Sequence, residues 1–420
     1  MTSFADAGLR PHTLAALAAV GITEPVPVQA EAIPPLLAGR DVVIEAPTGS
    51  GKTLAFLVPM IERLQRGPSW PRGLVVTPTR ELALQVEKVL SSLRTDLRSA
   101  VLYGGVGYAT QRLALRRGVD VVVGTPGRIM DLHAQGRLPL SRIEYLVLDE
   151  ADEMLDAGFA PIVEKLLAQT YEPQTVLASA TMPAWVTTVI EKHTRNAVQI
   201  RVGGDEESAL EHGLVRVARE HKLQTLSNVL KRHDAPAIVF GRTKHGVSKL
   251  NTNLRRLGHD SVELQGNLSQ SVRDRAMASF RGGRSEVLVA TNVAARGIDI
   301  AQVGLVVNFE LPDSSRWLTH RVGRTARMGE AGRALTFVTP EDELAWQKLS
   351  RQGSLAVREI DAASFIDEGL WRYKEHRSVP MQGAGAREIE GRRPRPGNDR
   401  RRRPSRWPAR ARSPRTDRAG

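Results

Sequence analysis

Short runs of β-branched and apolar residues recur along the first half of the chain, and each is followed by a turn and a helix-like stretch. These runs lie at residues 42–44, 74–76, 119–123, 145–148 and 175–177. Apolar strands that alternate with helices are typical of a parallel sheet covered on both faces. The pattern starts again at residues 237–240, 286–290, 305–309 and 334–338. The sequence therefore predicts two α/β domains with parallel sheets.

The break between the two halves falls at a Gly-rich acidic stretch, residues 203–207. We therefore expect a first domain at residues 1–204, a linker at 205–212 and a second domain at 213–365. Periodicity fades near residue 365, so residues 366–420 are expected to form a disordered Arg/Pro/Gly-rich tail. Residues 381–420 hold 13 Arg and 4 acidic residues, so they carry +9 of the net charge of +13.

The composition limits the partners and the chemistry of the chain. A net charge of +13 suits a polyanion such as nucleic acid. Because cysteine is absent, disulfides, thiolate metal sites and cysteine nucleophiles are excluded, and a reducing cytoplasm is the expected compartment. No apolar run reaches the roughly 18 residues of a membrane span, so we expect no membrane partner. The apolar stretch at residues 14–22 is expected to mark a helix, with Pro11 in its first turn and Gly21 just past its end.

The strand at residues 42–44 leads into the segment Ala-Pro-Thr-Gly-Ser-Gly-Lys-Thr and then into an apolar helix. A Gly-rich turn between a strand and a helix lets backbone N–H groups face phosphate oxygens. Lys52 is expected to neutralise the β and γ phosphates of ATP, and the Thr53 hydroxyl to bind Mg²⁺. Ala46 stands where the general pattern has its first Gly. The expected phosphate-binding residues are Thr48, Gly49, Ser50, Gly51, Lys52 and Thr53.

A second apolar strand, residues 146–148, ends in the carboxylates Asp149 and Glu150. We expect Asp149 to hold Mg²⁺ through water and Glu150 to polarise the water that attacks the nucleotide. Acidic residues after a strand also suit the first turn of a helix. Their combination with Lys52 and Thr53 favours the nucleotide site.

The tetrapeptide Asp149-Glu150-Ala151-Asp152 spells the signature of the DEAD-box family of helicase superfamily 2, and the resemblance extends over roughly residues 4–340. The other segments that carry it follow the family's motif order: residues 21–29, 46–53, 78–83, 104–105, 125–128, 179–181, 238–240, 270–273, 291–299 and 320–327. The resemblance implies two tandem RecA-like domains. It also implies RNA-stimulated ATP hydrolysis that separates short RNA duplexes or remodels ribonucleoproteins.

Three further residues contact the nucleotide according to this resemblance. The amide of Gln29 can both donate to and accept from the adenine edge. Phe4 either stacks on the base or packs as a hydrophobic cap on the first helix. Asp299 would touch the ribose or brace an arginine of the catalytic set.

Arg324 and Arg327 lie three residues apart, so on a helix they would share one face. The resemblance implies that they are arginine fingers, donated by the second domain to the γ-phosphate. With Lys52, Asp149 and Glu150 they make a catalytic set that neither domain holds alone. The residues expected to couple the nucleotide to RNA are Ser179, Thr181, Asp152 and His320. The alternative for Ser179 and Thr181 is that their hydroxyls only complete the hydrogen bonds of an ordinary strand end.

The RNA contacts implied by the resemblance are glycines, threonines and arginines that grip sugar and phosphate. Binding should therefore depend little on base sequence and should weaken with salt. Taken singly, most of these residues would be turn residues and helix caps. They are Pro78, Thr79, Arg80, Gly104, Gly105, Thr125, Gly127, Arg128, Gln270, Arg273, Thr291, Arg296 and Gly297.

The chain departs from the family pattern at Val26, where Thr is usual, at Asn292, where Asp is usual, and at Ala326, where Gly is usual. None of these positions belongs to the catalytic set, so we expect an active ATPase. Two other functions remain open: a DNA-acting helicase of the same superfamily, and an ATP-gated RNA clamp or assembly scaffold. The basic tail is either an RNA tether or a solubilising or assembly segment. We expect a monomeric core, with ribonucleoprotein components as candidate partners.

Overall fold

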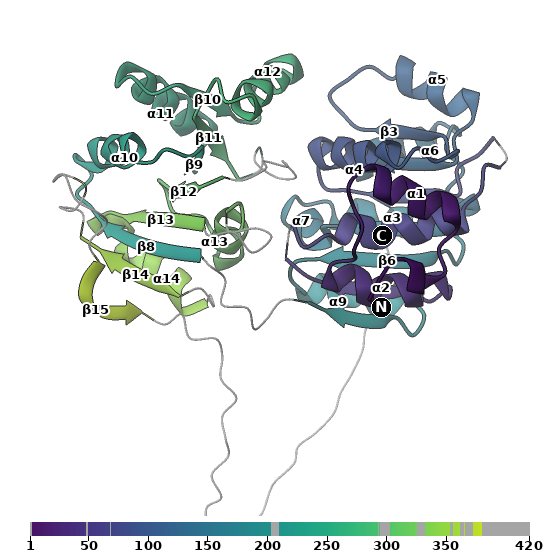
Figure 1. Ribbon diagram of the computed structural model, residues 1–420. Coiled ribbons are helices and arrows are strands. Elements are labelled where there is room, and N and C mark those ends of the chain that lie inside the picture. Colours follow the sequence, from purple (N-terminus) through teal and green to yellow (C-terminus); the bar gives the residue numbers. More distant parts are fainter. Residues whose placement is uncertain are drawn as a thin grey trace, which may run out of the picture. The chain divides into compact units, whose positions relative to one another are not determined.

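The computed structural model describes residues 2–47, 49–67, 69–202, 210–292, 294, 303–325, 332–352, 356–361, 365 and 373–379. The residues that it describes form two α/β domains (Figure 1). The two domains predicted from the alternating strands and helices are therefore confirmed. No helix among the described residues is long and apolar enough to cross a membrane.

The first domain is built on a seven-stranded sheet in the order β3-β4-β2-β5-β6-β1-β7, with parallel neighbours. The strands are β1 (Val42–Glu45), β2 (Gly73–Val76), β3 (Ser99–Leu102), β4 (Val121–Gly124), β5 (Tyr145–Asp149), β6 (Gln174–Ser179) and β7 (Val198–Arg201). The helical segments are η1 (Ala5–Ala7), α1 (Pro11–Ala19), α2 (Pro27–Leu37), α3 (Lys52–Arg63), α4 (Arg80–Ser92), α5 (Ala109–Arg117), α6 (Pro126–Ala134), η2 (Leu140–Arg142), α7 (Ala151–Asp156), α8 (Ala160–Leu167) and α9 (Ala184–His193).

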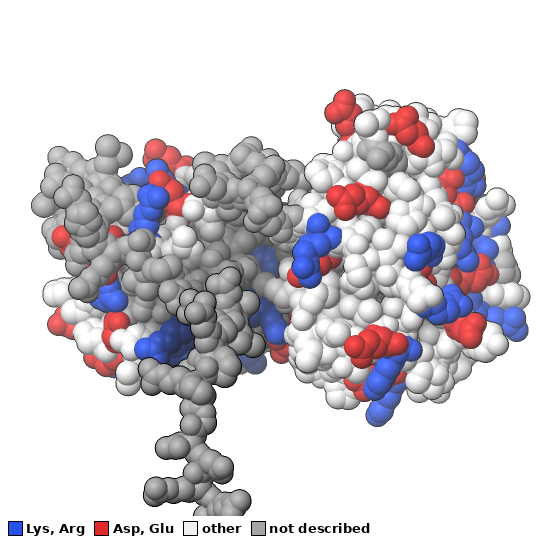
Figure 2. Space-filling view, turned by 90° about the horizontal axis from the view of Figure 1, so that it is seen from below, with Lys and Arg blue, Asp and Glu red and all other residues white. Residues whose placement is uncertain are grey.

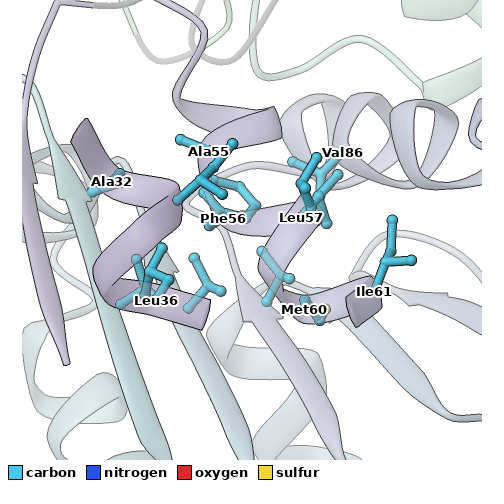
Figure 3. Close-up of a cluster of buried hydrophobic side chains, with 14 of the residues drawn as sticks. Ala32, Leu36, Ala55, Phe56, Leu57, Met60, Ile61 and Val86 are labelled. Atoms are coloured by element: carbon cyan, nitrogen blue, oxygen red, sulfur yellow. The ribbon is translucent and has the colours of Figure 1, made fainter. Parts of the chain in front are cut away.

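Apolar side chains on both faces of this sheet hold the helices against it. Along β1, Val42 and Ile44 belong to one buried cluster and Val43 belongs to another, because successive strand residues point to opposite faces. In the first cluster, side chains of α2 and α3 pack together, with Leu36 and Phe56 fully buried (Figure 3). This packing fixes α3 against β1 and so fixes the loop between them.

The second domain has an eight-stranded sheet in the order β10-β11-β9-β12-β13-β8-β14-β15. Only β15 pairs antiparallel, to β14, among the strand pairs of the described residues. The strands are β8 (Leu210–Arg216), β9 (Ala237–Gly241), β10 (Ser261–Leu264), β11 (Val287–Thr291), β12 (Leu305–Asn308), β13 (Gly332–Val338), β14 (Val357–Ile360) and β15 (Tyr373–Val379). The helical segments are α10 (Lys222–Lys231), α11 (Lys244–Arg256), α12 (Gln270–Arg281), α13 (Ser315–Val322), η3 (Pro340–Asp342) and α14 (Glu343–Gln352).

The predicted strands all lie within or beside observed ones, whereas six strands were not predicted. Five of these, β3, β7, β10, β14 and β15, lie at or next to a sheet edge, and β8 has an interrupted apolar pattern. Strand β8 begins at Leu210, inside the expected linker 205–212, and β15 lies inside the expected tail 366–420. The strand at 373–379 falls in the range expected as tail. Its polar sequence gives no strand signal, and it pairs through its backbone with β14. Residues 380–420, with the rest of the expected tail, lie outside the described residues.

Candidate functional site

The predicted functional residues of the first domain gather at one edge of its sheet. In a parallel sheet the carboxyl ends of the strands meet at the same edge, where ligands bind in open α/β folds. Strands β1, β5 and β6 are neighbours, and they lead into the phosphate loop, Asp149 and Ser179. Strands β3, β4 and β2 form the adjoining half, and they lead to Gly104, Thr125 and Thr79. The strand order therefore divides this edge into two halves, a nucleotide half with the residues predicted to bind ATP and a nucleic-acid half with those predicted to bind RNA.

The phosphate loop is a tight turn that ends at the first residue of α3. Gly51 has a φ of +98° at the N-cap of this helix. The Lys52 ammonium is buried, donates to the carbonyls of Ala46 at 2.6 Å and Pro47 at 3.1 Å, and lies 3.9 Å from Glu150 Oε1. A buried ammonium beside the free N–H groups of a helix N-terminus is a site for anionic phosphate. Thr48 lies outside the described residues.

Gln29 joins the adenine-motif segment to this loop. Its side chain is 3% exposed, and its Oε1 accepts from the Val26 N–H at 3.2 Å. Its Nε2 donates to the Gly51 carbonyl at 3.1 Å. Each end of the amide keeps one further hydrogen-bonding position, which is what reading an adenine edge requires. Phe4 is 3% exposed and packs in the buried cluster of the first domain, as the hydrophobic-cap alternative describes.

The acidic motif forms a buried cluster at the start of α7. Asp149, Glu150, Asp152 and Glu153 are between 0% and 6% exposed. Glu150 has a φ of +54°, a left-handed conformation that a non-glycine residue seldom adopts. Burial raises the pKa of Asp149, and the neighbouring charge of Glu150 raises it further. A cation at this position would favour the ionised carboxylate.

The donor set at this edge fits Mg²⁺ bound together with a nucleotide. The Asp149 carboxylate and the Thr53 hydroxyl are hard oxygen donors, which Mg²⁺ prefers. Among the described residues, no group of three or more His, Cys, Asp or Glu side chains could hold a metal ion alone. In ATPases, Mg²⁺ is usually held by one or two protein oxygens, supplemented by phosphates and waters.

Asp152 connects the acidic motif to the segment after β6. Its Oδ2 accepts from the Thr181 N–H at 2.9 Å and from the Thr181 hydroxyl at 2.7 Å. The Asp152 N–H donates to Ser179 Oγ at 3.2 Å, and Ser179 Oγ donates to the Thr181 carbonyl at 2.7 Å. The two hydroxyls therefore do more than complete a strand end, because they hold the acidic motif to the next strand of the sheet.

Side chains of the second domain meet the acidic helix α7. His320 Nε2 lies 3.5 Å from Asp152 Oδ2, and His320 Nδ1 lies 3.6 Å from Glu153 Oε1. Arg324 Nη2 donates to Glu153 Oε1 at 3.5 Å, and Arg316 Nη1 donates to Asp156 Oδ1 at 3.0 Å. The structure thus brings His320 and Arg324 to the motif that contains Asp149 and Glu150. Arg327, Arg296, Gly297 and Asp299 lie outside the described residues.

In the nucleic-acid half, the backbone at the glycines is accessible, whereas some arginine side chains already contact other protein groups. A side chain at Gly104, Gly105 or Gly127 would meet nothing within 4 Å, so these backbones are accessible. Thr79 caps α4 by accepting from the Leu82 N–H. Arg128 is 6% exposed and donates to Gln111 and to the Val106 carbonyl. The Arg128 side chain therefore shapes the 104–108 loop, and in this arrangement it is not exposed for a phosphate.

Two reciprocal ion pairs join predicted RNA residues of the two domains. Arg80 lies 3.6 Å from Asp274 and stacks on Tyr103 at 4.3 Å, while Arg273 lies 2.8 Å from Glu81. Gln270 donates to Asp274, and Thr291 is buried at the end of β11. Pro78 is buried and Thr125 is half-buried at the ends of their segments. On the coloured part of the face in Figure 2, basic and acidic side chains are interspersed.

Sequence reasoning missed several of these residues. It did not single out Glu153, which contacts both His320 and Arg324, or Gln111, which orients Arg128. The only available signal for Glu153 was its place one residue after the acidic tetrapeptide, on the first turn of a helix.

A phosphate loop, a carboxylate pair at a neighbouring strand end and basic side chains from a second parallel α/β domain are typical of nucleoside-triphosphatases with two tandem RecA-like domains. The family model described as DEAD/DEAH box helicase matches residues 26–189, and that described as Helicase conserved C-terminal domain matches residues 221–329. The chain belongs to the DEAD-box family of ATP-dependent RNA helicases. The expected fold class is confirmed by this membership and by the two sheets.

Solved structures and curated relatives agree with this assignment. The structure of Saccharomyces cerevisiae Dbp5 bound to RNA and ADP BeF3 is similar with a TM-score of 0.77 and 30% identity, covering 87% of this chain and 97% of that one. The ATP-dependent RNA helicase DeaD of Escherichia coli is 40% identical over 86% of this chain and 58% of its own length. Its counterpart in Mycobacterium tuberculosis is 41% identical over 81% of this chain and 61% of its own length. The chain thus spans about three fifths of these relatives.

Proposed function

We propose that this chain is an RNA-stimulated ATPase that uses ATP binding and hydrolysis to separate short RNA duplexes or to remodel ribonucleoproteins. One observation carries the proposal. Side chains of the second domain, His320 and Arg324, contact the same short helix that follows Asp149 and Glu150. Basic groups that reach the acidic motif from another domain can respond to a nucleotide held between Lys52 and that motif.

Each residue of the first domain has a defined task in this reaction. Lys52 and the N-terminus of α3 hold the phosphates, and Gln29 reads the adenine edge. Glu150 orients the attacking water and accepts its proton as the bond to the γ-phosphate breaks. Mg²⁺ held by Asp149 and Thr53 would neutralise charge on the phosphates. Arg324, with Arg327 by resemblance, stabilises the charge that develops in the transition state.

RNA is the proposed polymer partner, and its binding is coupled to the nucleotide through Asp152. Oxygens and N–H groups of Asp152, Ser179 and Thr181 are joined by four hydrogen bonds between the ends of the neighbouring strands β5 and β6. A shift of the acidic motif on nucleotide binding is therefore transmitted to the neighbouring strand ends. The open backbones at Gly104, Gly105 and Gly127 suit sugar and phosphate contacts, which are largely independent of sequence.

The test is steady-state ATP turnover of the full chain with matched single-stranded RNA and DNA, followed by displacement of a short RNA duplex. Stimulation by RNA and loss of turnover by at least about a hundredfold in Glu150→Gln are expected, with ATP binding retained. Equal stimulation by DNA would favour a DNA-acting helicase. Turnover without strand displacement would favour an ATP-gated RNA clamp. Near-normal turnover in Glu150→Gln would contradict the assignment of the site.

A further inference from the structure

A chain of buried polar side chains crosses the second sheet on the face covered by α13. His212 of β8, Thr336 of β13, Asn308 of β12 and Arg321 of α13 are each between 0% and 3% exposed. The apolar cluster on this face also includes Leu318 of α13. Polar groups in such surroundings are expensive unless each one is paired, so a connected chain of this length requires an explanation.

The strand register places the members of this chain next to one another. Asn308 pairs with Thr336 in the parallel ladder, and His212 pairs with Ala334, two residues before Thr336 and therefore on the same face. Asn308 Nδ2 donates to Thr336 Oγ1 at 2.9 Å, and His212 Nε2 lies 2.8 Å from that oxygen. Arg321 Nη1 donates to Asn308 Oδ1 at 3.2 Å. Four residues from three strands and one helix are thus joined without a break.

The guanidinium fixes the direction of the first two links. Arginine offers only donors, so the oxygen of the Asn308 amide must face Arg321 and its NH₂ group must face Thr336. The Thr336 oxygen accepts this bond, and its own proton is available to His212 Nε2 when the ring carries its proton on Nδ1. Burial lowers the pKa of His212 to about 4, so the ring is neutral and can accept. All donors point away from the buried cation, an order in which neighbouring hydrogen bonds strengthen one another.

Arg321 is held at the end of this chain by several further contacts. Its Nε donates to Asn292 Oδ1 at 2.6 Å, and its Nη1 donates to the Glu310 carbonyl at 2.6 Å. Its guanidinium also lies over the Phe240 ring, 5.0 Å from the centroid. The adjacent residue on the same helix is His320, and Arg324 lies two residues past the end of the helix at Val322. The rotation and height of α13, and with them the aim of His320 and Arg324, therefore depend on where Arg321 is held.

We propose that His212, Thr336 and Asn308 are positioning residues that fix Arg321, and through it α13, so that His320 and Arg324 meet the acidic helix α7. The proposal rests on the proposed ATPase function. It extends the site to a strand, β8, that begins directly after the segment 203–209 between the two sheets and lies two strands away from β12.

The main test compares Thr336→Val, which keeps the shape and removes the hydroxyl, with Thr336→Ser, which keeps the hydroxyl. Thr336→Val should lower the kcat of RNA-stimulated ATP turnover about tenfold, with the KM for ATP within about twofold of the wild type. Thr336→Ser should recover most of the loss. Thr175→Val is the matched control, because Thr175 is equally buried in the first sheet and its hydroxyl donates only to the Pro173 carbonyl, at 3.4 Å, among the described residues.

A second readout does not depend on ATP turnover. Hydrogen exchange of the α13 amides should accelerate in Thr336→Val and remain at the wild-type rate in Thr175→Val. If Thr336→Val does not fold, His212→Leu and His212→Gln replace it, since only Gln can still accept from Thr336. Leu should then lower kcat and loosen α13 relative to Gln.

The outcomes separate this inference from the proposed function. A wild type without RNA-stimulated turnover would overturn the proposed ATPase, and the exchange of α13 would then decide the positioning role alone. If the wild type is active, the inference is overturned when kcat and α13 exchange are the same in Thr336→Val as in Thr175→Val. The same conclusion follows when they are the same in His212→Leu as in His212→Gln. Either result would leave the ATPase assignment intact.

Discussion

His320 Nε2 lies 3.5 Å from Asp152 Oδ2, and both side chains are buried. Burial alone would lower the pKa of His320, but contact with Asp152 and the charges of Asp152, Glu153 and Glu150 raise it above 6.5. Burial alone would likewise raise the pKa of Asp152, but His320, Thr181 and Ser179 together hold it below 3.8. The contact is thus an ion pair between the two domains when His320 is protonated.

The first prediction is that closure of the domains weakens as the pH rises. A raised histidine pKa means that the pair stabilises the closed contact fully below pH 6.5 and that this stabilisation is lost as the pH rises through the raised value. Asp152 stays ionised throughout this range, because its pKa is lowered. In the presence of RNA and a non-hydrolysable ATP analogue, the closed fraction should fall as the pH rises above 6.5, through the raised pKa of His320.

The measurement is energy transfer between dyes on two introduced cysteines, which is simple because the chain has none. Tyr171 and Leu344 are suitable positions, being 77% and 81% exposed and in different domains. The control is His320→Gln, which cannot become charged and should show a flat profile over the same range. A wild-type profile as flat as that of the variant would contradict the prediction.

The second prediction concerns Arg324. Arg324→Lys keeps the charge but loses the planar fork, so it should lower kcat by at least about a hundredfold with little change in the KM for ATP. Arg316→Gln is the control, because Arg316 also joins α13 to α7, through Asp156, but this pair is partly exposed. Its kcat should change by less than about threefold. RNA-stimulated turnover of both variants under the same conditions is the measurement, and equal losses would argue against a specific role for Arg324.

Residues fixed by local backbone patterns could be predicted from the sequence. A strand that ends in a Gly-rich turn places Lys52 at a helix N-terminus, and a strand that ends in two carboxylates places Asp149 at the same sheet edge. These positions follow from strand polarity and need no knowledge of distant contacts. The same holds for Gly21, which has a φ of +76° just after α1, as its place in the sequence predicted.

Partners that come from distant parts of the chain could not be predicted. The pairing of Arg273 with Glu81 and the contact of Glu153 with Arg324 depend on how two folded domains meet, which no local pattern encodes. Arg128 was expected to be available to phosphate, but in the fold its guanidinium donates to Gln111 and stacks on Tyr108 at 4.0 Å. Edge strands such as β3 were not predicted, because half-buried positions give a weak apolar pattern in the sequence.

The third prediction is that Gly51→Ala impairs nucleotide binding. Gly51 has a φ of +98°, and an added Cβ would lie 2.6 Å from Val26 Cγ2 and 2.8 Å from Gln29 Nε2. The loop or Gln29 must therefore shift, and ATP affinity should fall at least about tenfold. Gly136→Ala is the control, because Gly136 also has a positive φ, +66°, but has open space around it. Titration with a fluorescent ATP analogue should show normal affinity in that variant, and a matching loss in both would show that backbone strain alone is responsible.

The fourth prediction is that Asn292→Asp stabilises the second domain. Arg321 is 1% exposed, and burial lowers its pKa to about 9 because no carboxylate bonds its guanidinium among the described residues, where Asn292 supplies an amide oxygen at 2.6 Å. A folded-state pKa below the usual 12.5 means that keeping Arg321 charged costs stability at neutral pH. An aspartate at 292 would supply a charge-assisted hydrogen bond, and the free energy of unfolding should rise by about 1 kcal/mol.

Thermal and denaturant unfolding at neutral pH measure this change, with Asn267→Asp as the matched substitution. Asn267 also accepts from a cation, Lys244 at 2.9 Å, but that contact is exposed, so its free energy of unfolding should change by less than about 0.5 kcal/mol. A larger gain at position 292 than at 267 is expected because the charge of Arg321 is desolvated and that of Lys244 is not. Equal changes in the free energy of unfolding at positions 292 and 267 would contradict the prediction, because they would mean that solvent screens the charge of Arg321 as it screens that of Lys244.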